Sequence, residues 1–252
     1  MPGRAEGDVA RMRVQRALAR AGVASRRRAD ALVAAGRVRV NGAVAMTGQA
    51  VDPRRDLITV DGVPVDAPAP VRWVVLHKPV GVLTTARDET ASKAARRTVF
   101  DLLPPDQRVR GMTYVGRLDY MTAGVLLLTT DGAAAHRLTH PSRAVERAYV
   151  ATVRGNAAAA LREIRGGVVL SDGPVVATRA AARPLGQGRW DLEITIAEGR
   201  TREIRRLCEA LGLEIERLVR TQFGPVHLGS LPAGHTRGLT PSERRAIEAF
   251  VT

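Results

Sequence analysis

Hydrophobic and polar positions follow two different periods along the chain, and these periods predict where helices and strands form. Residues 13–21 carry apolar side chains three or four positions apart, which is the spacing of one helix face. Ser25 is a favourable residue for a helix start and predicts a second helix over residues 26–35. Two strand patterns, at residues 38–40 and 57–60, are followed by Asn-Gly and Asp-Gly turn signals. Two short helices and a small hairpin are therefore expected near the N-terminus.

A longer segment mixes strand and helix patterns after a Pro- and Ala-rich stretch at residues 66–70, which is typical of a linker. We therefore expect a disordered leader over residues 1–10, a small domain with its linker over 11–66, and a larger domain over 67–252. In the larger domain, strands are expected at residues 73–77, 125–129, 147–153 and 190–197, and helices at residues 132–138, 157–164, 202–211 and 241–250.

The chain is strongly basic, with 39 Lys and Arg residues against 25 Asp and Glu residues and a net charge of +14. All but two of the basic residues are Arg, whose guanidinium group can make paired contacts with phosphate. An excess of this size favours a polyanionic partner such as a nucleic acid, and a generally basic solvated surface is the alternative.

Composition excludes several classes of protein. The single cysteine, Cys208, allows neither an intrachain disulfide nor a cysteine-based zinc cluster, and the histidines lack the spacing of a metal site. No stretch is apolar enough to span a membrane, and the N-terminal residues lack the apolar core of a signal peptide. We expect a cytoplasmic protein that uses no metal ion.

Arginines are concentrated in the small domain. Arg26, Arg27 and Arg28 fall at the start of the second expected helix, where backbone N–H groups also favour anions. Arg37 and Arg39 lie at the turn that follows this helix. These residues predict a phosphate-binding edge, and the alternative is a charged face that only contacts solvent.

Two stretches of the small domain, LARAGVASRR at residues 18–27 and GRVRVNG at residues 36–42, resemble the alpha-L RNA-binding domain. This is the RNA-binding domain of a small-subunit ribosomal protein, also described as the ribosomal-protein-S4 type. The resemblance implies that the arginines of the small domain bind RNA.

An acidic residue, Asp119, lies in a glycine-flanked loop that leads into an apolar strand. Residues 116–132, GRLDYMTAGVLLLTTDG, resemble the catalytic motif of pseudouridine synthases of the RsuA/RluB branch, which modify ribosomal RNA. Three further stretches agree in the same order: HKPVG at 77–81, ERAY at 146–149 and EGRTREIRR at 198–206. Within the last of these, Glu203 stands where the family usually has Gln, so its role is an open question.

The resemblance implies an α+β fold, in which a small alpha-L RNA-binding domain is followed by a pseudouridine synthase catalytic domain. That catalytic domain is built on a mixed, mainly antiparallel sheet with flanking helices. The resemblance also implies roles for three residues: Asp119 as the catalytic carboxylate, Tyr149 stacked on the flipped-out base, and Arg205 paired with Asp119. The predicted RNA-binding residues are Arg26, Arg27, Arg28, Arg37, Arg39, Lys78, Arg117 and Arg202.

Isomerising uridine breaks the N1–C1′ bond and forms a C5–C1′ bond, with no redox change and no net hydrolysis, so no cofactor is expected. A carboxylate can act covalently on C1′ or on the pyrimidine ring, or remove a ribose proton, and the sequence does not choose among these routes. The expected partner of this chain, taken as a monomer, is ribosomal RNA or a pre-ribosomal particle. The large-subunit 23S RNA is favoured, and the alternatives are the 16S RNA or a non-catalytic assembly factor.

Overall fold

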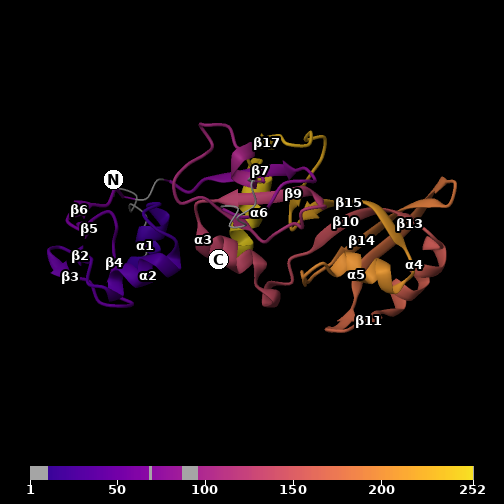
Figure 1. The fold of residues 1–252 in the computed structure, drawn as a ribbon, viewed down its shortest axis with the longest axis horizontal. Coiled ribbons are helices and arrows are strands. Elements are labelled where there is room, and N and C mark those ends of the chain that lie inside the picture. The colour runs from indigo at the N-terminus through magenta and orange to yellow at the C-terminus, as the bar shows by residue number, and fades with distance from the viewer. Residues whose placement is uncertain (1–10, 68–69, 87–95, 252) are drawn as a thin grey trace, which may run out of the picture. The chain divides into compact units, whose positions relative to one another are not determined.

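The structure, a computed structural model, describes residues 11–67, 70–86 and 96–251 (Figure 1). The leader predicted over residues 1–10 lies outside the described residues. The chain divides into two compact units. The first is formed mainly by the residues before Trp73, and the second by most of the remaining chain.

The first unit contains both expected helices and a small antiparallel sheet with the strand order β3-β2-β5-β6. Ser25 begins the second helix as predicted, because its hydroxyl accepts the backbone N–H of Arg28 at 3.3 Å. The Asn-Gly pair after β2 has positive φ at both residues, 52° and 86°, as a tight hairpin turn requires. The elements are β1 (Met12–Arg13), α1 (Val14–Arg20), α2 (Arg26–Ala34), β2 (Val38–Val40), β3 (Ala43–Val44), β4 (Ala50–Val51), β5 (Ile58–Val60) and β6 (Val63–Pro64).

The second unit is built on a sheet with the strand order β13-β14-β10-β15-β9-β7-β17. In addition, β8 pairs with β9, and β16 pairs with β15. Among the described strand pairs of this sheet, β15 and β9 run parallel and the other pairs run antiparallel. The expected mixed, mainly antiparallel sheet is therefore confirmed.

The strands of the second unit are β7 (Trp73–Lys78), β8 (Thr113–Val115), β9 (Ala123–Thr129), β10 (Arg147–Arg154), β11 (Val168–Leu170), β12 (Gly173–Val175), β13 (Ala177–Gly186), β14 (Arg189–Ile196), β15 (Glu214–Phe223), β16 (Val226–His227) and β17 (Thr236–Arg237). Its helices are η1 (Val99–Leu102), α3 (Gly132–Thr139), η2 (Pro141–Arg143), α4 (Ala157–Gly166), α5 (Glu203–Ala210) and α6 (Pro241–Val251).

Two hydrophobic clusters cover different parts of this sheet. One joins α4 and α5 to β10, β14 and β15, and the other joins α3 and α6 to β7 and β9 (Figure 1). All seven residues of β9 are buried, which explains why its sequence is a continuous apolar run without alternation. In the strand order, the parallel pair of β9 and β15 lies where the part of the sheet under one cluster gives way to the part under the other, and the candidate site described below lies beside this pair.

Sequence patterns missed two long strands of the sheet, β13 and β15. Charged residues interrupt the alternation in both, and β15 carries Arg217 and Arg220 within its apolar stretch. Arg220 is only 2% exposed, so a buried charge replaces the apolar residue that the pattern would need. In the described part of the chain, no helix is both long and apolar enough to cross a membrane.

Candidate active site

Asp119 lies in a short turn between β8 and β9. The backbone N–H of Thr122 donates to the Asp119 carbonyl at 3.0 Å, and the hydroxyl of Thr84 donates to the Leu118 carbonyl at 2.9 Å. These bonds fix the backbone on both sides of the carboxylate, whose side chain remains 34% exposed. The acidic group is therefore held on an ordered turn and can still be reached from outside.

The side chain of Lys78 holds this turn in place through hydrogen bonds to backbone carbonyls. It is fully buried at the end of β7, and its ammonium group donates to the carbonyls of Pro79, Asp119 and Thr122 at 2.9–3.1 Å. Burial lowers the pKa of Lys78 to about 8, an effect that Asp119 opposes and Arg220 reinforces. The sequence predicted an RNA contact for Lys78, but a side chain without exposed surface instead holds the loop of the catalytic motif.

A cavity of about 480 Å³ opens beside Asp119. Its size falls within the range of about 300–1,000 Å³ that is usual for small-molecule sites. Asp119, Tyr149 and Arg205, which the sequence analysis assigned to the chemistry, all line it. They come from three separate parts of the second unit: the β8–β9 turn, β10 and α5.

Arg205 reaches from the first turns of α5 toward Asp119. Its Nε atom lies 4.0 Å from Oδ2 of Asp119, and its Nη2 atom donates to the Met121 carbonyl at 2.8 Å and to the Thr122 hydroxyl at 3.3 Å. Burial lowers the pKa of Arg205, Arg202 adds to this effect, and Asp119 opposes it. The guanidinium thus makes one long contact with the carboxylate and fastens itself to the loop that carries it.

Arg220 is a second cation at the cavity, and the sequence analysis did not single it out. It is nearly fully buried on β15, where its Nε atom donates to the Val125 carbonyl at 2.8 Å. Among the residues that the structure describes, its Nη2 atom has no hydrogen-bond partner. Burial lowers the pKa of Arg220, and neighbouring Tyr149 opposes that shift. The sequence signal was an isolated Arg in the apolar run LVRTQF.

Two guanidinium groups lie near the ring of Phe223, which lines the cavity. Arg220 and Arg147 lie 5.0 and 5.3 Å from its centroid, within the range of cation–π contacts. Arg147 also donates to the Val145 carbonyl at 2.7 Å, which keeps its side chain in place. This part of the cavity wall is therefore positively charged.

The predicted RNA-binding arginines fall into two groups. In the first unit, the side chains of Arg26, Arg27 and Arg28 are exposed at the start of α2. Arg37 forms a paired contact with Asp61 at 2.5 and 2.8 Å, so its charge is already balanced. Arg39 is exposed and donates to the Gly42 carbonyl at 2.9 Å. In the second unit, Arg117 and Arg202 are exposed side chains that line the cavity.

Within the described residues, no group of three or more His, Cys, Asp or Glu side chains is placed to share a metal ion. The charged and phenolic groups that line the cavity are two carboxylates, those of Asp119 and Glu203, two phenols, those of Tyr120 and Tyr149, and several guanidinium groups. Both oxygens of Glu203 are bonded to Arg200, so such a set can bind an anionic ligand and carry out acid, base or nucleophilic chemistry at Asp119.

Comparison with known proteins connects this site to a family. A family model described as RNA pseudouridylate synthase matches residues 72–210, and an S4 domain model matches residues 12–58. An uncharacterized RNA pseudouridine synthase of Mycobacterium tuberculosis is 40% identical over 92% of this chain and 91% of its own length.

Two further relatives carry the name ribosomal large subunit pseudouridine synthase B. The Bacillus subtilis protein is 37% identical over 94% of this chain and 96% of its own length. The Escherichia coli O157:H7 protein is 42% identical over 90% of this chain and 77% of its own length. A crystal structure of a pseudouridylate synthase superimposes with a TM-score of 0.60 at 26% identity, covering 94% of this chain and 99% of the other. This chain therefore belongs to the RNA pseudouridylate synthase family.

Proposed function

We propose that this protein converts a uridine of large-subunit ribosomal RNA to pseudouridine, with Asp119 as the catalytic carboxylate. The observation that carries the proposal is the position of Asp119, on a fixed turn at the edge of a cavity whose other walls carry Tyr149 and several arginines. The names of the Bacillus subtilis and Escherichia coli relatives support the large-subunit substrate.

Each residue of the cavity takes a role that follows from its chemistry. The flipped-out uridine enters the cavity, and the ring of Tyr149 stacks on the base and helps to remove the C5 proton. Asp119 acts on C1′, on the pyrimidine ring or on a ribose proton while N1–C1′ is broken. Arg205 faces the carboxylate, with its Nε atom 4.0 Å from Oδ2 of Asp119. The ring then rotates, C5 bonds to C1′ and loses its proton, and N1 takes up a proton, so the composition of the nucleotide is conserved.

The first unit supplies affinity rather than chemistry in this proposal. Its exposed arginines bind RNA phosphates, while Arg117 and Arg202 bind phosphates near the target nucleotide. The substrate is ribosomal RNA or a pre-ribosomal particle in the cytoplasm, and the enzyme acts as a monomer without a cofactor.

Replacing Asp119 with Asn tests the chemistry, because the amide keeps the shape of the side chain but removes the reacting carboxylate. We expect the variant to release no tritium from RNA that carries 5-tritiated uridine, while its RNA affinity stays within about threefold of the wild type. Turnover like that of the wild type would contradict the role of Asp119.

A second experiment identifies the substrate. Pseudouridines are mapped in both ribosomal RNAs of a strain that lacks this gene, with and without a plasmid that carries it. We expect one large-subunit pseudouridine to disappear and to return with the plasmid. Loss of a small-subunit pseudouridine, or no loss at all, would contradict the proposed substrate.

A further inference from the structure

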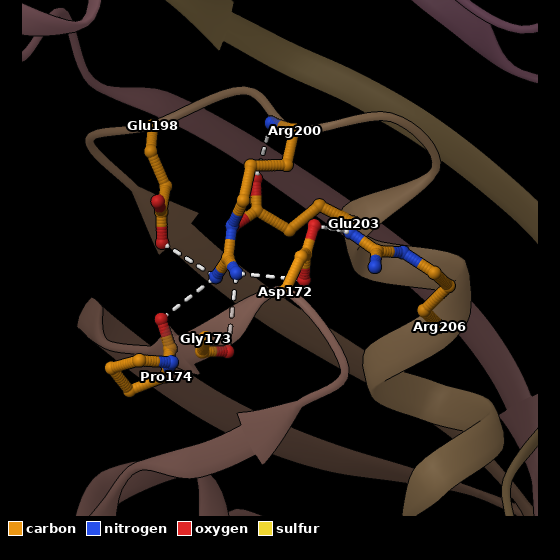
Figure 2. A network of polar contacts seen from close by, with 7 residues as sticks. All are labelled: Asp172, Gly173, Pro174, Glu198, Arg200, Glu203 and Arg206. Atoms are coloured by element: carbon orange, nitrogen blue, oxygen red, sulfur yellow. Dashed lines mark hydrogen bonds and ion pairs between the residues drawn. The ribbon is translucent and has the colours of Figure 1, made fainter.

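A network of polar contacts joins the loop before α5 to the turn between β11 and β12 (Figure 2). Arg200 lies at its centre. Its guanidinium contacts Asp172 at 2.9 Å, Glu198 at 2.9 Å and Glu203 at 3.0 Å, and also donates to the carbonyls of Gly173 and Pro174 at 3.1 and 2.7 Å. Arg206 adds a contact of 2.7 Å with Asp172.

Glu203 is the buried member of this network. Its side chain is only 2% exposed, and its two oxygens accept from the backbone N–H and from Nε of Arg200, at 2.9 and 3.0 Å. A buried carboxylate is strongly unfavourable unless it is paired and hydrogen-bonded. Glu203 and Arg200 therefore depend on each other for their positions.

Both arginines of the network are paired with carboxylates of the protein. Arg200 and Arg206 face three carboxylates, those of Asp172, Glu198 and Glu203. Their guanidinium groups consequently have little capacity left for RNA phosphates, although Arg200 lines the cavity. The network has a structural purpose, unlike the exposed Arg202 that lies within the same loop.

The backbone of this loop is held in an uncommon conformation. Arg202 has a φ of 52°, in the left-handed region that non-glycine residues rarely adopt. It lies between Arg200 and Glu203, whose backbone and side chains are bonded to each other on either side of it. These bonds force the tight turn that starts α5.

Opposite sides of the first turn of α5 face the β11–β12 turn and the loop that carries Asp119. Residues two positions apart in a helix point about 200° apart. Glu203 faces Arg200 and the β11–β12 turn, while Arg205 faces Asp119, Met121 and Thr122. The start of α5 is thus held by contacts on both sides.

We propose that Arg200 and Glu203 are positioning residues for the isomerisation, which clamp the start of α5 to the β11–β12 turn so that Arg205 reaches Asp119 and Thr122. This inference rests on the proposed function for its effect on turnover. Glu203 thereby acquires a role. The family usually has Gln at this position, and a Gln side chain would supply one acceptor oxygen where Glu203 supplies two.

The kinetic test compares Glu203→Leu with Glu203→Gln. Displacing a catalytic group by about 1 Å can lower turnover by about 100-fold. We therefore expect Glu203→Leu to lower kcat by about 30-fold or more, with KM for RNA changed by less than about threefold. Glu203→Gln, which retains one acceptor, should recover most of the lost kcat. Equal kcat values for the wild type and Glu203→Leu would overturn the proposal.

A double-mutant cycle separates positioning from a general loss of structure. If Glu203 acts through Arg205, then adding Glu203→Leu to Arg205→Met should lower kcat by little more than Arg205→Met does alone. Multiplicative losses would mean that Glu203 acts independently of Arg205, and would overturn the proposal. Glu216→Leu is the matched control, because Glu216 pairs with Arg154 and Arg189 but does not line the cavity. Its kcat should equal that of the wild type.

A measurement that does not depend on turnover completes the test. Arg205, with 17% of its side chain exposed, should react slowly with phenylglyoxal in the wild-type protein, as followed by mass spectrometry. Asp172→Ala alters only the exposed end of the network and should raise that rate at least threefold, even if Glu203→Leu does not fold. Glu216→Leu should leave it unchanged. An unchanged rate in Asp172→Ala would overturn the proposal. If the rate rises in Asp172→Ala but the wild-type protein has no isomerase activity, only the proposed function is contradicted.

The pH dependence of kcat gives a further readout. Burial, and then the neighbouring Glu198, raise the pKa of Glu203, while hydrogen bonds from Arg200 lower it. Of the other charged groups around Glu203, Arg206 and Arg147 interact with it and Asp172 lies across Arg200. Protonated Glu203 keeps one acceptor oxygen, as Gln does, so the small advantage in kcat of the wild type over Glu203→Gln should disappear toward acid pH. A ratio of the two kcat values that does not change with pH would overturn the positioning role.

Discussion

Gly124 lies opposite Arg220 in the parallel pairing of β9 with β15, and no side chain fits between the two strands. A β-carbon on Gly124 would collide with the backbone of Arg220, and Gly124 has a φ of 118° that other residues rarely adopt. The glycine of the catalytic motif therefore allows the strand that carries the buried Arg220 to approach the strand that follows Asp119.

Replacing Gly124 with Ala should destabilise the second unit by about 3–5 kcal/mol, because backbone and not a flexible side chain occupies the space. The free energy of unfolding in denaturant measures this effect. Gly166→Ala, at the end of α4 with nothing within 4 Å of the added carbon, is the matched control and should be close to neutral. Similar losses in the two variants would show that the close approach does not matter.

Tyr149 should contribute through both its ring and its hydroxyl. Tyr149→Phe keeps the ring, so RNA affinity should hold while turnover falls by about 100-fold, the scale of one acid–base contribution. Tyr149→Leu should in addition weaken binding by about 1–3 kcal/mol, the worth of one base–aromatic stack. Tyr114→Phe, whose ring packs against Phe100 and not on the cavity, serves as the control. A fully active Tyr149→Phe would exclude a proton-transfer role for the hydroxyl.

The exposed arginines of α2 should determine how strongly RNA binding depends on salt. Replacing Arg26, Arg27 and Arg28 together with Gln removes three candidate phosphate contacts, which should reduce the slope of log K against log salt by about 2. Arg37→Gln should change the slope less, because Asp61 already balances that charge. The measurement is a binding titration at several salt concentrations. An unchanged slope in the triple variant would mean that this surface does not contact RNA.

Buried Cys208 should make the fold lose stability at alkaline pH. Burial raises the pKa of its thiol from 9.0 to about 12, so the folded protein keeps a proton that the unfolded chain releases above pH 9. Stability is fully present below pH 9 and declines as the pH rises from 9 toward 12. Relative to Cys208→Ala, the wild type should therefore lose about 2 kcal/mol of unfolding free energy between about pH 7.5 and 10.5. Parallel pH profiles of the two proteins would contradict this assignment.

Local signals in the sequence determined much of the fold. Ser25 starts a helix and the Asn-Gly pair makes a turn because each depends on residues only a few positions away. The apolar run of β9 predicted a buried strand for the same reason, and the structure buries all seven of its residues. The motif around Asp119 indicated the family without any structure, because its pattern is contained in one continuous stretch.

Only the tertiary structure decided what the buried charges do. Lys78 donates a hydrogen bond to Asp119, 41 residues away in the sequence. Arg220 lines the cavity, but its charge interrupts the apolar pattern of β15, so this strand was not predicted. The environment of Glu203 is likewise set by tertiary structure, because its partner Arg200 also bonds to Asp172 in the β11–β12 turn. The physical reason is that a charge can be buried only beside its partners, and those partners are brought together by folding rather than by sequence.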